Sequence, residues 1–445
     1  MAGQLDTDSL LLLHDALARL EQGFETLPPL DPDASDPAAL RKVLNEVADR
    51  MRDNYPYFHP QYAGQMLKPP HAVARLAYAL AMWINPNNHA LDGGRASSAM
   101  EKEAVAALAR MFGWDTHLGH LTSGGTMANL EALWIAGELK PASTVLASAQ
   151  AHYTHGRISA VLKLPFDSIT TDDRGRMDIG ALEQRLKAGG VGTVVATLGT
   201  TAVGSVDPLP EILALRDRYG FRLHADCAYG GYYVLADNLA APARAAFDAL
   251  GQVDSIVIDP HKHGLQPYGC GCVLFRDPTV GGHYRHESPY TYFSSKELHL
   301  GEISLECSRP GAAAVALWAT QRLFPLVRGG AFAKMLEDCR AAALEFHALL
   351  AADTRFIPAF APELDIVVWA ARAATTAESS ARARETFGKA ARAGLHLALA
   401  ELPAAFFGDP WGAGGQVTAL RSVMMKPEHR ANLATIGKLL SGSAA

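Results

Sequence analysis

Short apolar runs alternate with helical repeats through the middle of this chain. The runs are rich in β-branched side chains and predict buried strands, while residues 179–187 and 209–219 show the apolar spacing of helices between them. A chain that alternates strands with helices folds into a mostly parallel sheet covered by helices, so we expect an α/β fold. The strands are expected at 144–147, 193–198, 221–225, 255–258 and 271–275.

Helical patterns dominate the two ends of the chain. Residues 8–26 and 38–52 predict two helices joined by a proline-rich linker, and the first carries an apolar stripe. That stripe needs a partner, which is either a second subunit or the rest of its own lobe. The last third of the chain predicts a smaller α+β lobe. The expected division is an N-terminal helical arm with a substrate-loop segment over 1–95, a large domain over 96–330 and a small domain over 331–445.

Composition argues against several classes of protein. The formal net charge is −6 and no block of Lys or Arg stands out, so we expect no nucleic-acid surface. No apolar run is long enough for a bilayer and no signal peptide is seen, which favours a soluble, cytoplasmic protein. The five cysteines are an odd number without a CxxC pair, which favours a reducing compartment. Cys270 and Cys272 lack the usual spacing of metal ligands, so we expect strand thiols and no metal.

Glycine and hydroxyl residues mark the start of one predicted helix. Ser123-Gly124-Gly125-Thr126 precedes a helical pattern that continues to Lys140. Free backbone N–H groups, hydroxyl donors and the positive end of a helix dipole form a cradle for phosphate. A turn with an N-cap explains the same residues, so the phosphate site is one of two interpretations.

Polar side chains follow four of the predicted strands. They are His152, Thr200 with Thr201, Asp226, and His261 with Lys262. Open α/β sheets bind their ligands outside the carboxyl ends of the strands. We therefore expect these side chains to meet at one site.

Lys262 and Asp226 together indicate a particular chemistry. A lysine amine has an ordinary pKa of about 10.4 and acts as a nucleophile only in special surroundings. A buried carboxylate requires a cationic partner, and a protonated pyridine nitrogen is one. Pyridoxal phosphate (PLP) uses a lysine for its aldehyde, and a carboxylate beside its ring nitrogen keeps that nitrogen protonated. Either residue alone reads as an ordinary charge, but with the phosphate cradle and a stacking His152 they predict a PLP site.

Six motifs resemble those of the group II PLP-dependent amino acid decarboxylases, in the same order along the chain. The resemblance runs from about Phe58 to Pro427. It implies PLP-dependent transferase fold type I, a homodimer with active sites at the subunit interface, and loss of CO2 from an L-amino acid. The motifs are Thr122–Asn129, Ala151-His152-Tyr153, Gly199-Thr200-Thr201, His224–Ala228, Pro260-His261-Lys262 and Glu306-Cys307-Ser308-Arg309.

The resemblance also implies roles for single residues. Lys262 is the Schiff-base lysine, Asp226 pairs with the pyridine nitrogen, and His152 stacks on the ring. Arg421 resembles the arginine that meets the substrate carboxylate, although a salt bridge within its own lobe explains it equally well. The other implied cofactor contacts are Ser123, Gly124, Gly125, Thr126, Thr200, Thr201, Ala228 and His261.

Two tyrosines precede the Glu306–Arg309 motif, and one of them is expected to act as the proton donor. The family acid that returns a proton to Cα is usually a loop tyrosine, and Tyr290 and Tyr292 are the candidates, with Tyr290 preferred. Loss of that tyrosine in the family diverts the product to an aldehyde. Two neighbouring tyrosines therefore favour an amine as the product.

The sequence leaves more than one substrate class open. Residues 55–62 are rich in aromatic side chains and include Phe58 and His59 as candidate substrate contacts, although packing explains the segment equally well. We expect an aromatic L-amino acid of the tyrosine, DOPA or tryptophan type. Because His59, Gln61, Gln65 and Arg285 suit a second carboxylate, an acidic L-amino acid such as glutamate, aspartate or cysteine sulfinate is the alternative. Another PLP lyase, an aminotransferase or an aldehyde-forming decarboxylase of the same fold is the second alternative.

Overall fold

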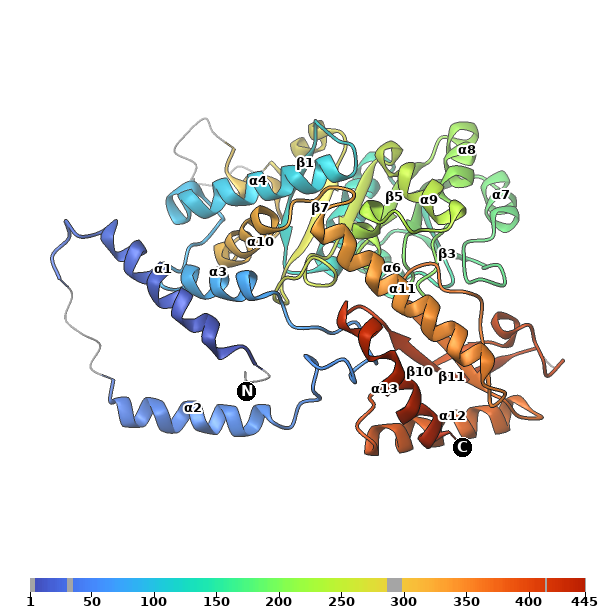
Figure 1. Cartoon of the computed structure of the whole chain (residues 1–445). Helices are drawn as coiled ribbons and strands as arrows, with labels where there is room; N and C mark the ends of the chain where they lie inside the picture. The colour runs from blue at the N-terminus through green and yellow to red at the C-terminus, as the bar shows by residue number, and fades with distance from the viewer. Residues whose placement is uncertain (1–4, 30–34, 286–297, 413, 445) are drawn as a thin grey trace.

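A computed structural model describes residues 5–29, 35–285, 298–412 and 414–444. Within these ranges the chain forms a central sheet covered by helices, a smaller sheet near the C-terminus and a helical arm at the N-terminus (Figure 1). The expected α/β fold class, with a mostly parallel sheet and a smaller C-terminal α+β lobe, is confirmed.

The central sheet has the strand order β1-β7-β6-β5-β4-β2-β3. Strands β6, β5, β4, β2 and β3 pair in parallel, and β7 runs antiparallel to both of its neighbours. Parallel pairing places the carboxyl ends of β2, β4, β5 and β6 along one edge. The bounds are β1 Leu118–Thr122, β2 Thr144–Ser148, β3 Phe166–Ile169, β4 Val191–Thr197, β5 Arg222–Asp226, β6 Ser255–Ile258 and β7 Gly271–Phe275.

Both faces of this sheet are buried. On β6, Ile256 and Ile258 join the main core cluster, whereas Val257 points to the other face and packs with Ala128 and Ala132 of α5. A strand buried on both faces reads as a continuous apolar run, which explains why these strands were predicted. The helices of this lobe are α4 Arg95–Met111, α5 Gly125–Leu139, α6 Thr154–Val161, α7 Ile179–Lys187, α8 Leu209–Tyr219, α9 Ala241–Asp248 and α10 Gly311–Leu323.

The small lobe is an antiparallel sheet with helices packed on it. Its strand order is β10-β11-β9-β8, and the fully buried Trp369 packs edge-on against Phe346 from a neighbouring helix. The helix that carries Phe346 begins directly after the large lobe. The bounds are α11 Ala331–Ala352, β8 Phe356–Pro358, β9 Ile366–Ala371, α12 Thr376–Arg392, β10 Ala398–Pro403, β11 Gln416–Val423 and α13 Glu428–Ser443.

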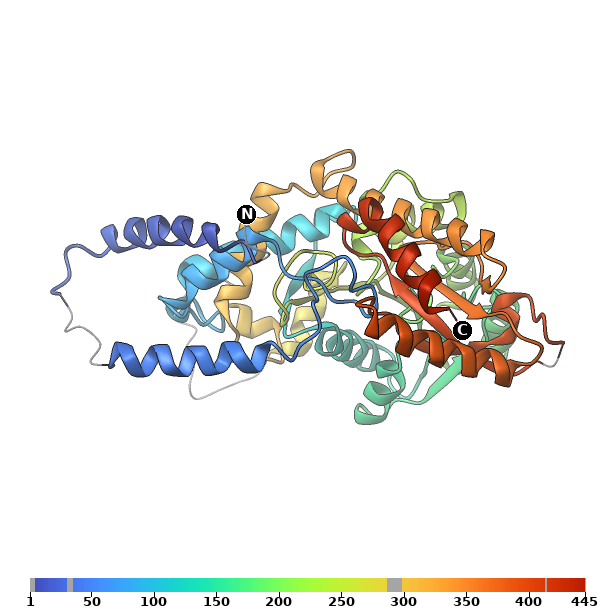
Figure 2. The same cartoon turned by 60° about the horizontal axis from the view of Figure 1, so that its bottom comes forward.

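The N-terminal arm lies outside both cores. Helix α1 (Leu10–Gln22) runs beside α3 (Ala72–Met82), and α2 (Pro37–Met51) stands clear of the body in both views (Figures 1 and 2). Neither α1 nor α2 has a single buried residue. Of the two partners considered for this arm, α1 has its own chain. The apolar side chains of α2 remain exposed.

Several elements were absent from the sequence-based expectation. Strand β1 carries Gly119 and His120, β3 lies at the sheet edge with a polar sequence, and β8 is only three residues long, so none has a β-branched apolar run. The five cysteines are free, and both Cys270 and Cys272 are buried as expected. Among the described helices, none is both long and apolar enough to cross a membrane.

Lys426, just after β11, makes the stability of this fold depend on pH. Its side chain is 3% exposed, its Nζ donates to the carbonyl of Tyr62 at 2.6 Å, and burial lowers its pKa to about 7. The unfolded amine has a pKa of about 10.4, so between pH 7 and 9 the unfolded chain holds a proton that the folded chain has released. The free energy of unfolding therefore gains up to about 1.4 kcal/mol per pH unit from this group as the pH rises.

We expect Lys426→Met to remove this gain. Denaturant unfolding at pH 7, 8 and 9 measures the free energy of unfolding of both proteins, and their difference should change with pH. The exposed Lys438 on α13 provides the control, and Lys438→Met should give a difference that is constant across the range. A constant difference for Lys426→Met as well contradicts the prediction.

Candidate active site

Most of the predicted site residues line one cavity of about 310 Å³ at the carboxyl edge of the central sheet. The loops that follow β1, β2, β4, β5 and β6 all reach this cavity, as expected for an open α/β sheet. The residues predicted from the sequence that line it are Ser123, Gly124, Gly125, Thr126, His152, Thr201, Asp226, Ala228, His261 and Lys262.

The β1–α5 turn brings four of these residues to the start of a helix. Helix α5 begins at Gly125, so the backbone N–H groups of its first turn have no partner inside the helix. Glycine is required here by close approach: a Cβ on Gly125 would lie 2.7 Å from a carboxylate oxygen of Asp259, and one on Gly271 would lie 2.5 Å from the carbonyl carbon of Gly124. The turn is therefore a cradle of backbone donors at the positive end of a helix dipole.

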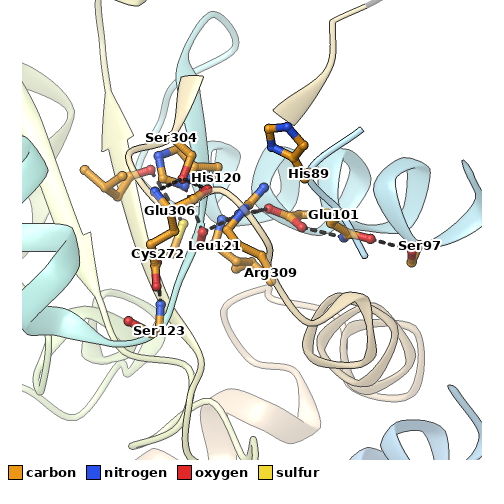
Figure 3. Close-up of polar contacts among 12 residues, drawn as sticks. His89, Ser97, Glu101, His120, Leu121, Ser123, Cys272, Ser304, Glu306 and Arg309 are labelled. Atoms are coloured by element: carbon orange, nitrogen blue, oxygen red, sulfur yellow. Dashed lines mark hydrogen bonds and ion pairs between the residues drawn. The ribbon is translucent and has the colours of Figure 1, made fainter. Parts of the chain in front are cut away.

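A buried polar network holds the strand that leads into this turn (Figure 3). Glu101 Oε1 accepts from the N–H of Leu121 at 3.0 Å and pairs with Nη1 of Arg309 at 2.8 Å. The same Nη1 donates to the carbonyl of Leu121 at 2.5 Å. Three residues earlier in the chain, Glu306 accepts from the N–H of Ser123 at 2.9 Å. The segment 304–309 thus contacts both ends of Leu121–Ser123 and fixes the entry to the cradle.

Asp226 ends β5 with its carboxylate at the cavity wall. It is 4% exposed, its Oδ2 lies 2.8 Å from Nε2 of His155, and its Oδ1 accepts from the N–H of Ala228 at 3.1 Å. Burial would raise the pKa of Asp226, but the hydrogen bond and charge of His155, with the charge of Lys262, hold it well below its ordinary value. The carboxylate therefore stays ionised at neutral pH and can stabilise a cation inside the cavity.

Lys262 enters the same cavity from the turn after β6. Its Nζ lies 3.1 Å from Oδ2 of Asp259, and the side chain is 19% exposed. His261, beside it, lies against the ring of Tyr268 with 4.8 Å between centroids, and burial lowers the pKa of His261. An amine and an ionised carboxylate therefore line one cavity, in which His261 is a neutral group.

His152 closes another side of the cavity. Its Nδ1 lies 2.7 Å from Oγ1 of Thr154, which fixes the ring, and burial lowers its pKa, so the imidazole is neutral at neutral pH. Thr201 also lines the cavity. Thr200 is fully buried behind it, where its Oγ1 accepts from the N–H of Ser205 at 3.0 Å and closes the turn after β4.

Other predicted residues lie elsewhere. Phe58 and His59 belong to the segment whose Tyr62 pairs with His396, just before β10 of the small lobe, and they are not among the residues lining the cavity. Arg421 is 4% exposed, and its guanidinium donates to the carbonyls of Gly64, Thr201 and Ala202 at 2.7–3.1 Å. No carboxylate of the described residues pairs with Arg421, so the salt bridge considered from sequence is not formed. Tyr290 and Tyr292 lie outside the described residues.

The structure adds residues that the sequence analysis did not select. His155 supports Asp226, and Asp259 faces Lys262. On β5, two residues before Asp226, Nε2 of His224 lies 2.8 Å from Oδ1 of Asn129. Burial lowers the pKa of His224 to about 3, so this ring is a neutral link between α5 and β5. Asp259 was detectable, because it precedes Lys262 by three residues, whereas the pairing of His155 depends on tertiary structure.

The residues present fit PLP. Three cavity residues, Thr197, Asp259 and His261, each keep a buried polar atom without a hydrogen-bond partner in the structure, which is expected of a site that holds a polar ligand. The cradle at Ser123–Thr126 suits the phosphate, Asp226 suits the ring nitrogen, and Lys262 suits the aldehyde. When bound, PLP supplies an aldehyde for an amine and a protonated ring that accepts electrons.

Comparisons with known proteins agree with this fit. The model of the pyridoxal-dependent decarboxylase conserved domain matches residues 25–372. An L-tyrosine decarboxylase of Enterococcus faecium is 28% identical over 64% of this chain and 63% of its own length, and an L-aspartate decarboxylase of Thermococcus kodakarensis is 29% identical over 63% and 72%. The chain thus spans a little under two thirds of the Enterococcus relative. A crystal structure of Oryza sativa TDC with PLP and tryptamine has a TM-score of 0.79 at 20% identity, covering 99% of both chains.

Lys262→Ala should abolish covalent capture of PLP, because no other lysine of the described residues lines the cavity. Borohydride reduction followed by mass spectrometry measures the fraction of chain that carries the cofactor. The exposed Lys438 is again a suitable control, and Lys438→Ala should be labelled like the wild type. A reduced adduct of normal yield in Lys262→Ala would show that another amine holds the cofactor.

Proposed function

Because the chain belongs to the pyridoxal-dependent decarboxylase family, we propose that it removes CO2 from an L-amino acid with PLP held in the cavity described above. One observation carries the proposal: the Lys262 amine, the Asp226 carboxylate and the Ser123–Thr126 cradle line a single cavity. Each group matches a different part of one cofactor, and unrelated functions have no reason to bring all three together.

The proposal assigns a task to each group. The N–H groups at the start of α5 bind the phosphate, with the dipole of the helix behind them. Asp226, kept ionised by His155, holds a proton on the ring nitrogen. Lys262 would hold the aldehyde of the cofactor, and Asp259, whose Oδ2 lies 3.1 Å from its amine, would orient that amine. The neutral ring of His152 stacks on the cofactor and orients the substrate carboxylate.

We further propose an aromatic substrate. Lys262 is the only Lys or Arg among the described residues that line the cavity, and burial lowers the pKa of both His152 and His261. A second carboxylate on the substrate would therefore meet no charged partner there, and burying it unpaired would cost several kcal/mol. The residues considered for an acidic substrate from sequence, including His59 and Gln65, lie outside this lining, and Gln65 accepts a hydrogen bond from Arg421 at 3.2 Å.

Aromatic side chains of the 55–62 segment pack beside the small lobe, where Tyr62 pairs with His396. Tyr57 and Tyr62 are in edge-on contact at 4.9 Å, and Tyr55 lies 4.7 Å from the ring of His396. Arg421 joins this segment to the cavity loop, because it donates to Gly64 on one side and to Thr201 on the other. These rings lie outside the cavity lining, and we propose that the segment forms an outer wall on which an aromatic substrate side chain packs.

Release of CO2 from the twenty L-amino acids, DOPA and cysteine sulfinate tests the proposal directly. We expect the highest kcat/KM for tyrosine, DOPA or tryptophan, by at least about 100-fold over glutamate and aspartate, because an unpaired buried charge costs several kcal/mol. Higher values for the acidic substrates would reverse the choice, and no release from any substrate would end the decarboxylase assignment. Detection of amine or aldehyde in the same reactions separates simple decarboxylation from the aldehyde-forming alternative.

The arm supports a homodimer as the working form. Leu40, Val43, Leu44, Val47 and Met51 recur along one stripe of α2 and are each at least half exposed. An apolar stripe of this length on a helix that contacts little of its own chain is a docking face. We infer that a second copy of this chain covers it and that the active sites lie near the resulting interface.

Leu44→Asp should shift the protein toward monomer, because it places a charge in the middle of this stripe. Sedimentation velocity over a range of protein concentrations measures the shift. Asn45→Asp adds the same charge one residue away, on another side of the helix, and should leave the association unchanged. A wild-type protein that sediments as a monomer at micromolar concentration contradicts the inference.

A further inference from the structure

Three consecutive residues of the small lobe dock on three loops of the cavity. Just before β9, Glu363 Oε2 accepts from the N–H of Val206 at 2.6 Å, in the loop after β4. Leu364 packs on Gly199 and Gly230, where a Cβ built on either glycine would lie 3.0 Å from its Cδ1. Asp365 follows and reaches the turn after β6. We call residues 363–365 the docking segment.

Asp365 is the most deeply buried member of this segment. Its side chain is 0% exposed, its Oδ1 accepts from the hydroxyl of Tyr229 at 2.5 Å, and its Oδ2 lies 3.2 Å from Nε2 of His263. Burial would raise the pKa of Asp365, but His263 and the hydroxyl of Tyr229 lower it below its ordinary value. A charge this deep in the protein is costly unless every partner stays in place.

Both partners of Asp365, His263 and Tyr229, lie close in sequence to Lys262 and Asp226. His263 is the next residue after Lys262, and Tyr229 is three residues after Asp226 and itself lines the cavity. The rings of Tyr229 and His263 are in contact, with 4.8 Å between centroids, and Tyr233 meets the same imidazole edge-on at 5.3 Å. Asp365 therefore holds the far side of the two turns that present Lys262 and Asp226.

We propose that Asp365 is a positioning residue, which acts through His263 and Tyr229 to hold Lys262 in the orientation needed to capture and hold the cofactor. The proposal deepens the proposed function and rests on it only for the identity of the cofactor. Under this proposal a small-lobe residue, more than one hundred positions from Lys262 in the sequence, controls the orientation of the lysine side chain.

The alternative is that Asp365 only fastens the two lobes together. Glu363 distinguishes the two, because it lies in the same docking segment, is 5% exposed and accepts from the other lobe, yet its partners are Val206 and the guanidinium groups of Arg174 and Arg176. Those partners do not touch Lys262. Loss of lobe docking alone should therefore affect Glu363 and Asp365 variants alike.

Asp365→Asn and Glu363→Gln are matched isosteric variants that each remove one carboxylate charge. The full-length apoenzymes are mixed with PLP, and the rate of covalent capture is followed by borohydride trapping and mass spectrometry. Visible circular dichroism of each loaded protein reports the orientation of the bound cofactor. Both readouts are independent of the substrate, so they remain valid even if no decarboxylation is found.

We expect Asp365→Asn to slow capture by about tenfold and to change the visible circular dichroism, since a misplacement of 1 Å is enough to cost up to about 100-fold. Glu363→Gln should match the wild type in both readouts, even where it lowers the melting temperature. Tyr229→Phe removes only the hydroxyl that donates to Asp365, and it should alter the visible circular dichroism in the same direction. If Asp365→Asn does not fold, the same comparison is made with Tyr229→Phe. Equal changes in the Asp365 and Glu363 variants, or none in Asp365→Asn and Tyr229→Phe, overturn the proposal.

Discussion

The hydrogen bond between His155 and Asp226 is the interaction on which the cavity depends. A lone carboxylate at this depth would take up a proton, because burial disfavours its charge. His155 reverses that preference from the first turn of α6, at 2.8 Å, and the N–H of Ala228 adds a second donor. The site therefore holds a fixed negative charge before any cofactor arrives. A cation that entered the cavity would be stabilised by this charge.

Position in the sheet turns this charge into a site. Strand β5 is flanked by β4 and β6. Because the three strands are parallel, the residues that follow β4 and β6 lie at the same edge of the sheet as Asp226. Lys262 arrives from β6 and Thr201 from β4, while the cradle arrives from β1, which is separated from β6 by β7. The close approach of Gly271 on β7 to Gly124 explains how the cradle reaches the cavity across that intervening strand. Buried polar links, such as Glu101 with Arg309 and His224 with Asn129, then fix the helices to the strands. Such links add little net stability but define one arrangement.

The sequence predicts the sheet, the cavity loops and the family because each has a local signal. Strands buried on both faces are continuous apolar runs, and polar residues directly after them mark the binding edge. The family and the cofactor named from six motifs agree with the domain match over residues 25–372, whereas the roles of single residues remain predictions. Asp365 and His155 had no such signal, because each acts on a residue more than 70 positions away through a side chain that is ordinary in its own segment. Arg421 shows the same limit: the salt bridge considered within its own lobe is not formed among the described residues, and its guanidinium donates instead to backbone carbonyls of two distant segments and to Gln65. Its contact with a substrate carboxylate stays a prediction.

The proposal of an aromatic substrate rests on how the charges of the cavity are already used. Asp226 is bound by His155, the amine of Lys262 faces Asp259, and burial keeps His152 and His261 neutral. In the proposed function these groups would contact the cofactor, and none of the described lining residues offers a further cation for the end of a substrate side chain. In the proposed function, selection would then come from the 55–65 segment, whose aromatic rings lie outside the cavity lining and which Arg421 fastens to the cavity loop at Thr201. A wall of this kind favours flat apolar side chains but discriminates weakly among them, since one added hydroxyl changes binding only modestly unless a buried polar group awaits it. If the substrate is aromatic as proposed, acidic side chains should be excluded sharply and aromatic ones ranked by small differences.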